Sequence, residues 1–126
     1  MSIFCLFCIG CGGALGAMLR GFCTDKLKPH ATSGFPWPTL SINIAACIIA
    51  GIVTGLSLDS CYTIPLCMGF LGALSTMSTM NYEAVTLYVH RERRRCCFYL
   101  VLSYALCIGS LGIASACAHA ALALIG

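Results

Sequence analysis

The chain has very few charged residues. Asp, Glu, Lys and Arg make up only 9% of its 126 residues, against about 25% in a typical soluble globular domain. Apolar residues make up 60% of the sequence, so a water-soluble fold would lack the polar side chains that cover its surface. The net charge of +3 is also too small to indicate nucleic-acid binding. These shortages exclude an ordinary soluble domain and favour a lipid bilayer as the surroundings.

Side chains that serve acid–base catalysis are equally scarce. The sequence has four acidic residues and three histidines, and His30, His90 and His119 are far apart along the chain. It contains no plausible catalytic triad and no glycine-rich loop of the kind that cradles phosphate. We therefore expect no enzyme activity.

Cysteine, in contrast, is abundant, but its distribution does not indicate a disulfide framework. The eleven cysteines are an odd number, and most of them lie inside apolar runs. There a cysteine acts as a small hydrophobic residue. Transport of a soft metal stays open as an alternative, because thiols and thioethers suit Cu(I). The sulfur residues that suggest it are Cys5, Cys8, Cys11, Met68, Met77 and Met80.

Four apolar stretches are each long enough for a helix that crosses a bilayer, which takes about 20 residues. The first stretch has no basic region before it and no convincing cleavage site, so we expect it to be retained. The predicted fold is all-α, a single integral membrane four-helix bundle. A chain of this size cannot easily enclose a pathway alone, so we expect an oligomer. The predicted spans cover residues 3–20, 39–58, 61–89 and 97–125.

The basic residues follow one pattern across these spans. All of them fall in the loops 21–38 and 90–96 or, in the case of Arg20, at the edge of the first loop. Four spans place both loops on one side of the membrane, while the termini and the turn at Asp59 lie on the other. Because positively charged loops stay inside, we expect the two loops to be cytoplasmic and both termini to be outside.

The third span is unusual because polar and small residues interrupt it near mid-membrane. Gly, Ser, Thr and Asn are frequent between Gly69 and Glu83. A break between Gly72 and Ser75 would free main-chain carbonyls and N–H groups, which survive at this depth only when they are buried in protein or line a wet cavity. The alternative is a continuous helix whose hydroxyls bond back to the preceding turn.

Other polar side chains within the spans are candidates for a pathway, because such residues are costly in lipid. Asn43 offers two donors and two acceptor sites, yet it could equally make an interhelical hydrogen bond that only holds the bundle. Glu83 is the sole carboxylate within a span, and either proton coupling, a pair with Arg20 or a local hydrogen bond would explain it. Tyr104 could offer its hydroxyl or serve in packing.

Three segments in order resemble the small fluoride channels, the Fluc or CrcB-like family, over essentially the whole chain. They are Gly12-Gly-Ala-Leu-Gly16-Ala-Met-Leu-Arg20, Pro38-Thr-Leu-Ser-Ile-Asn43 and Gly69-Phe-Leu-Gly72-Ala-Leu-Ser75-Thr-Met-Ser78-Thr79-Met80-Asn-Tyr-Glu83. The resemblance implies an antiparallel dimer that exports cytoplasmic fluoride passively and so relieves its toxicity.

The resemblance also implies roles for single residues. Backbone carbonyls of Gly72 and Ser75 from each subunit would hold a structural sodium ion at the centre. The anion path would be lined by Asn43, Ser78, Thr79 and Tyr104, with Arg20 near its vestibule. This sequence departs from the family where two phenylalanines are expected: those positions are Met77 and Met80, and a thioether lacks the quadrupole of an aromatic ring.

The one-sided charge is a second departure. A homodimer of antiparallel subunits needs a chain that inserts in both orientations. Such a chain should carry similar numbers of basic residues in the loops on the two sides of the membrane. This chain therefore fits one half of a heterodimer whose partner is an oppositely oriented relative. Two other functions stay open: a small multidrug-type exporter, although such proteins use a carboxylate in the first span and none is present here, and a non-transporting membrane assembly protein.

Overall fold

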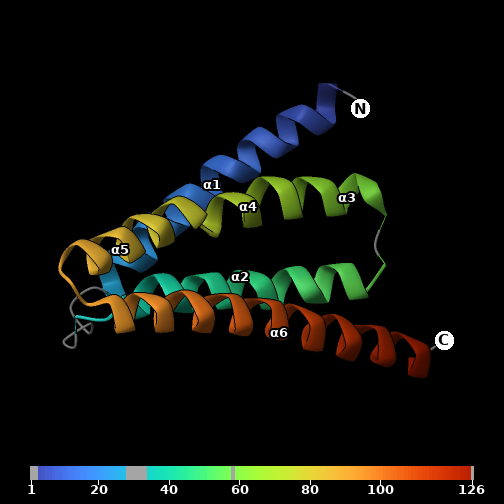
Figure 1. Cartoon of the computed structure of the whole chain (residues 1–126). Helices are drawn as coiled ribbons and strands as arrows, with labels where there is room; N and C mark the ends of the chain where they lie inside the picture. The colour runs from blue at the N-terminus through green and yellow to red at the C-terminus, as the bar shows by residue number, and fades with distance from the viewer. Residues whose placement is uncertain (1–2, 28–33, 58, 126) are drawn as a thin grey trace.

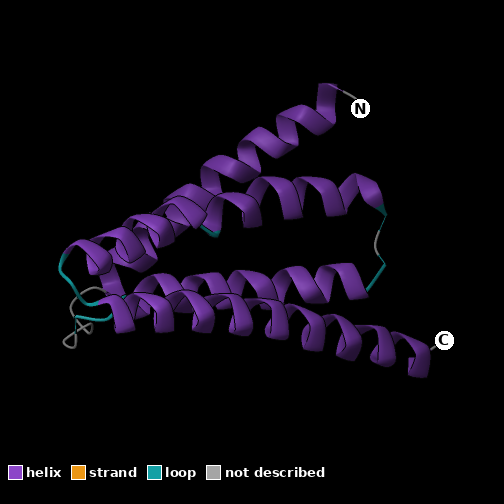
Figure 2. Cartoon of the chain, in the orientation of Figure 1, coloured by secondary structure: helices purple, strands orange, loops and turns teal. Residues whose placement is uncertain are grey.

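The computed structural model describes residues 3–27, 34–57 and 59–125, and its helices form an elongated bundle from which the start of the N-terminal helix diverges (Figures 1 and 2). Four helical segments of the described chain are long and apolar enough to cross a membrane, which confirms the all-α prediction of four spans. In chain order the helices are α1 Ile3–Leu27, α2 Trp37–Gly55, α3 Ser60–Ile64, η2 Pro65–Leu71, α4 Gly72–Leu74, α5 Met77–Val89 and α6 Arg93–Ile125. The third span consists of four consecutive segments: α3, the short π-helix η2, α4 and α5.

The first span is longer than predicted. α1 continues past Arg20 to Leu27, so the predicted loop 21–38 is wrong over its first residues. No proline interrupts residues 21–27, and a basic residue such as Lys26 in the last turn is favourable at a helix C-terminus. The Lys26 ammonium lies 5.6 Å from the centre of the Phe22 ring. Lys28 and Pro29, also assigned to this loop, lie outside the described residues.

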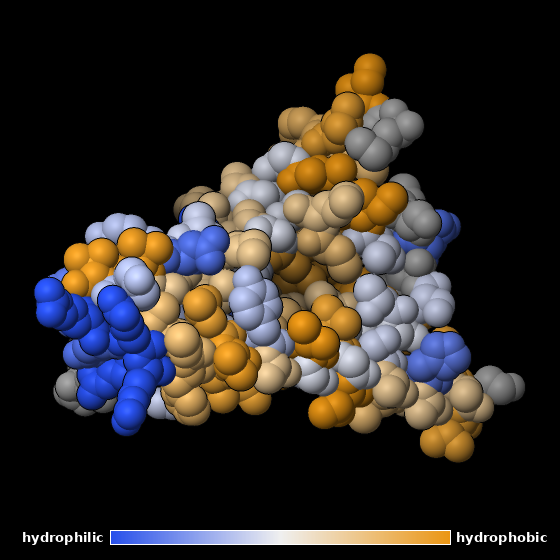
Figure 3. All heavy atoms as spheres, viewed as in Figure 1, coloured by the Kyte–Doolittle hydropathy of each residue, from blue (hydrophilic) through white to orange (hydrophobic). Residues whose placement is uncertain are grey.

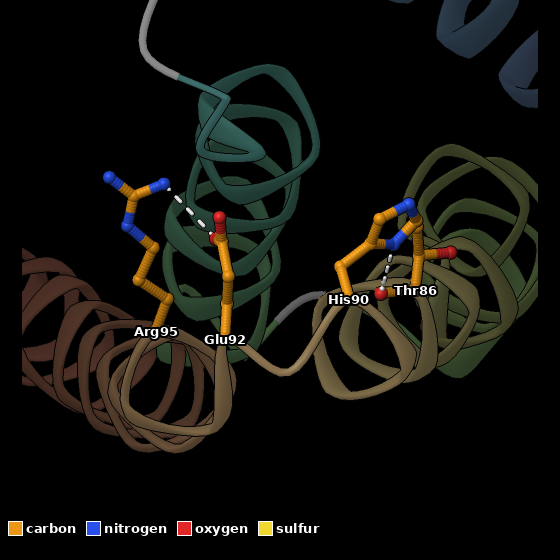
Figure 4. A network of polar contacts seen from close by, with 4 residues as sticks. All are labelled: Thr86, His90, Glu92 and Arg95. Atoms are coloured by element: carbon orange, nitrogen blue, oxygen red, sulfur yellow. Dashed lines mark hydrogen bonds and ion pairs between the residues drawn. The ribbon is translucent and has the colours of Figure 1, made fainter.

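The second loop is shorter than predicted for the same reason. α6 begins at Arg93, so the arginines of the predicted loop 90–96 from Arg93 onward occupy its first turn. Arginine is a good helix former and no proline or glycine interrupts the segment. Figure 4 shows the connection: Arg95 donates to Glu92 at 3.1 Å, and the His90 ring lies 2.8 Å from the carbonyl of Thr86.

Close packing between α2 and α6 depends on two glycines of α2. A Cβ atom at Gly51 would lie 2.5 Å from the Leu111 carbonyl oxygen, and one at Gly55 would overlap the Ser115 carbonyl oxygen. The contacts advance along both helices together, so α2 and α6 run parallel. These small-residue contacts let the two helices approach closely. Gly109 and Gly112 of α6, in contrast, face open space.

The first span packs against the first half of the third in the same manner. A Cβ atom at Gly16 would overlap the Phe70 carbonyl oxygen, and one at Gly12 would lie 3.2 Å from the Phe70 amide nitrogen. A glycine of the third span also contributes to this contact. A Cβ atom at Gly69 would lie 2.7 Å from the carbonyl oxygen of Ile9 in α1. Gly12 and Gly16, four residues apart in α1, therefore both pack against the third span.

Polar and apolar surfaces are segregated along the bundle. The space-filling view shows a strongly hydrophilic patch at one end, where α5 turns into α6, and apolar side chains over much of the remaining visible face (Figure 3). A shallow depression at that end is lined by Arg91, Glu92, Arg93, Arg94 and Arg95. The start of α1 and the end of α6 lie at the opposite end (Figure 1). This layout agrees with a multi-pass membrane protein whose basic residues gather on one side.

Candidate functional site

The third span is interrupted at Ser75 and Thr76. Both residues have extended backbone angles, with φ −72° and ψ 141° at Ser75 and φ −138° and ψ 107° at Thr76. The predicted interruption is therefore confirmed and the continuous helix is wrong. Its position differs from the prediction, because Gly72 and the residues up to Leu74 remain helical.

Asn43 of α2 holds this interruption open. Its Oδ1 accepts a hydrogen bond from the backbone N–H of Thr76 at 3.0 Å and one from the Ser75 hydroxyl at 3.2 Å. A backbone N–H can only donate, so the amide oxygen must face the break and the NH₂ group must point away from it. Asn43 itself is only 5% exposed.

Thr76 starts the second half of the span. As the N-cap of α5, its Oγ1 accepts from the backbone N–H of Thr79 at 3.2 Å. The same oxygen lies 3.1 Å from the Ser78 hydroxyl and 3.0 Å from the Thr79 hydroxyl. A threonine hydroxyl is a strong N-cap acceptor, so the Ser/Thr cluster that the sequence offers as a pathway also begins a helix.

These two side-chain acceptors change the hydrogen bonding of two carbonyls. In a continuous α-helix the carbonyl of Gly72 would accept from Thr76, and that of Ser75 would accept from Thr79. Here the Thr76 N–H donates to Asn43 and the Thr79 N–H donates to the Thr76 hydroxyl. The carbonyls of Gly72 and Ser75 each lose the donor that an unbroken helix would supply.

A cavity of about 180 Å³ lies beside the break, between α2, α5 and α6. It brings together five of the predicted site residues: Asn43, Met77, Met80 and Tyr104 of the expected anion path, and Ser75 of the expected sodium site. Ser78, Thr79 and Arg20 do not line it. The complete lining consists of Asn43, Cys47, Ser75, Met77, Met80, Ser103, Tyr104 and Cys107.

Ser103 is the most informative residue of this lining. Its side chain is 2% exposed, and its hydroxyl has no hydrogen-bond partner among the described residues. A buried polar group without a partner costs about 1–3 kcal/mol, so the Ser103 hydroxyl is a donor that the geometry of the described residues leaves unused. Together with the Asn43 amide and the Tyr104 hydroxyl, the cavity offers hydrogen-bond donors to an anion.

Comparison of the sequence with known proteins identifies the family of this chain. The family described as "CrcB-like protein, Camphor Resistance (CrcB)" matches residues 7–115. The chain belongs to the CrcB-like family. It is 37% identical to fluoride-specific ion channel FluC 3 of Bifidobacterium longum, over 93% of this chain and 97% of that protein. It is 36% identical to fluoride-specific ion channel FluC 2 of Clostridium acetobutylicum, over 84% of this chain and 89% of that protein.

Glu83 of this CrcB-like chain has a structural explanation. Its Oε1 accepts from the Thr39 hydroxyl at 2.7 Å and its Oε2 accepts from the Tyr99 hydroxyl at 2.8 Å. Hydrogen bonds therefore account for Glu83, but they are not the local bond that the sequence leaves open, because both donors lie on other helices. The structure places no ion pair between Glu83 and Arg20, both of which are described. The carboxyl group ties α2, α5 and α6 together near the basic end.

Several residues in and around the candidate site were missed from the sequence. Cys47 follows Asn43 by four residues and Cys107 follows Ser103 by four, so each lies one helical turn from a polar cavity residue. This spacing was a usable signal, because residues four apart share a helix face. Thr39 and Tyr99, the partners of Glu83, gave no comparable signal, since they contact it from other helices.

Proposed function

We propose that this chain is a subunit of a fluoride-selective channel, which lets cytoplasmic fluoride leave the cell passively. The observation that supports the proposal most directly is its likeness to fluoride-specific ion channels over nearly its full length. Hydrogen fluoride crosses membranes as a neutral acid and dissociates inside, so the trapped anion needs an exit. A channel that supplies this exit relieves fluoride toxicity.

The anion path runs through the cavity beside the break. Moving a small anion from water into a medium of low dielectric costs on the order of 20 kcal/mol by idealised Born estimates, so conduction requires replacement donors. Asn43 supplies an NH₂ group, and Ser103 and Tyr104 supply hydroxyls. Ser78 and Thr79 continue the path beyond the cavity, and Arg20 attracts the anion toward its vestibule.

Met77 and Met80 stand where ring edges are expected to face fluoride. Both line the cavity, Met80 from a buried position and Met77 with 61% of its surface exposed. A thioether lacks the positive edge of an aromatic ring, so we expect slower conduction than with phenylalanine. The donors of Asn43, Ser103 and Tyr104 carry the larger share of the stabilisation.

A structural sodium ion fits the break. The carbonyls of Gly72 and Ser75, which lack their usual helical donors, are hard oxygen ligands of the kind that hold sodium at unwound segments of membrane helices. The ion would neutralise these main-chain dipoles, and two subunits would supply two carbonyls each. Replacement of sodium by a larger cation should loosen the assembly, which separation by size in detergent would detect.

Two antiparallel subunits form the channel in this proposal. Gly72, Ser78 and Asn81 are exposed on the single chain although they lie near the break at mid-span. Irregular or polar main chain at this depth must be covered by protein, and an inverted second subunit presents the same segment at the same depth.

The one-sided basic residues favour an oppositely oriented relative as that partner, with residues 21–38 and 90–96 in the cytoplasm. A reporter fused to the C-terminus should then show one orientation only; two orientations in equal amounts would favour a homodimer.

Fluoride efflux from vesicles tests the function. Purified protein inserted from detergent adopts both orientations, so antiparallel pairs can form without a second gene product. Fluoride-loaded vesicles with the wild-type chain should release fluoride when potassium is allowed to cross, and Ser103→Ala should slow this release. Ser110→Ala is the matched control, because the Ser110 hydroxyl donates to its own helix at the Cys107 carbonyl. If protein-free vesicles release fluoride as fast as vesicles with the wild-type chain, the channel function is refuted. If Ser103→Ala and Ser110→Ala slow the release equally, the proposed path past Ser103 is refuted.

A further inference from the structure

Sulfur forms an unusual share of the cavity wall. Cys47 of α2 and Cys107 of α6 contribute thiols, and Met77 and Met80 of α5 contribute thioethers. These four side chains come from three helices and converge on one space of about 180 Å³. The proposed sodium site uses none of these four side chains, and the proposed anion path passes the two thioethers but gives no role to the two thiols.

The fold explains why the two thiols are neighbours. Cys47 precedes Gly51 by one helical turn, and Cys107 precedes Leu111 by one turn. Gly51 touches the Leu111 backbone, and the two helices run parallel, so the same close approach continues back to the cysteines. Both Cys47 and Cys107 line the same cavity.

The chemistry of this wall selects a soft cation. Thiolates and thioethers bind Cu(I) and related soft ions, whereas sodium, magnesium and calcium prefer oxygen. Ser103 also lines the cavity, and its buried hydroxyl has no partner among the described residues. With a thiol pair on one side and thioethers on the other, the cavity offers two strong and two weaker soft ligands.

We propose that Cys47, Cys107, Met77 and Met80 form a binding site for a soft monovalent cation of the Ag⁺ or Cu⁺ class, and that occupancy closes the anion path. Binding releases protons from the thiols, because thiolates are the ligands. The bound ion and its ligands then fill the space that fluoride must cross. Metal binding does not depend on the proposed channel function, whereas closure of the path rests on it.

Silver is the probe, because it needs no reductant to stay monovalent. Silver binding to the purified full chain is measured by competition with a chromophoric chelator in nitrate buffer, and fluoride efflux is measured with and without silver in the same vesicles. The test variant is Cys47→Ala/Cys107→Ala. The matched control is Cys97→Ala/Cys117→Ala, which removes two exposed thiols that do not line the cavity.

We expect silver to block efflux through the wild type and the control variant at the same concentration. Removal of Cys47 and Cys107 should raise the silver concentration for half-block by more than about 100-fold, since loss of even an outer-shell partner costs 10- to 100-fold. The same variant should lose one tightly bound silver ion per chain, and the volume-conserving Met77→Leu/Met80→Leu should weaken binding without abolishing it.

The two proposals fail in different ways. If silver binding and block are equal in the Cys47→Ala/Cys107→Ala variant and in the control, the site is refuted while fluoride efflux stands. If silver binding shows the predicted difference but no variant conducts fluoride, the site stands and the channel function is refuted.

Discussion

Replacement of Asn43 by alanine tests the residue that holds the break open. The change removes the acceptor for the Thr76 N–H at 3.0 Å and for the Ser75 hydroxyl at 3.2 Å. Thr76 is only 6% exposed, so its N–H cannot turn to solvent. A buried donor left without its partner costs about 1–3 kcal/mol, which corresponds to roughly 5- to 150-fold in the folding equilibrium. We expect Asn43→Ala to lose that stability and to conduct no fluoride.

Asn43→Asp separates the two roles of the amide. Aspartate keeps an acceptor oxygen for Thr76 in either protonation state but removes the NH₂ donor that faces the cavity. We therefore expect this variant to unfold at nearly the wild-type denaturant concentration in detergent and still to conduct no fluoride. The reasoning would be refuted by Asn43→Ala unfolding like the wild type, or by Asn43→Asp conducting at the wild-type rate.

Three further predictions concern packing, the buried carboxyl group and the cavity wall. Gly51→Ala should destabilise the bundle by about 1–3 kcal/mol through overpacking against α6, whereas Gly109→Ala, whose Cβ meets nothing within 4 Å, should not; equal melting temperatures would contradict this. Glu83→Gln should cost about 1–3 kcal/mol, because one of two donated hydroxyls loses its acceptor. Glu92→Gln, which alters the exposed pair with Arg95, should cost at most about 1 kcal/mol. If denaturant unfolding shows the same loss of stability for Glu83→Gln and Glu92→Gln, the buried network of Glu83 does not stabilise the fold. Met77→Phe should raise fluoride efflux roughly two- to tenfold, the value of an aromatic edge contact, and a slower efflux would show that the ring edge is not what this position lacks.

The number of helices and the interruption were predictable from the sequence because both follow from composition. Long apolar runs without charges determine four spans, and the dense Ser, Thr and Gly residues after Gly69 mark a segment that a bilayer helix would not otherwise carry. Asn43 and Tyr104 were identifiable as isolated polar residues in apolar surroundings. The structure places both beside the break.

Details that depend on contacts between distant segments were not predictable. The break lies at Ser75 and Thr76 because Asn43, from another helix, takes the Thr76 N–H, and no local pattern gives that pairing. Helix ends were also missed at α1 and α6, because a charged residue such as Arg20 or Arg95 can end an apolar run without ending the helix. Tertiary contacts and helix propensity decide these positions.

Selective release of fluoride is the most direct measurement. Vesicles that contain the purified chain and are loaded with equal fluoride and chloride are made permeable to potassium, and both anions are followed with selective electrodes. The account predicts that fluoride leaves rapidly and chloride stays at the level of protein-free vesicles. Retention of both anions, or equal release of both, would contradict it.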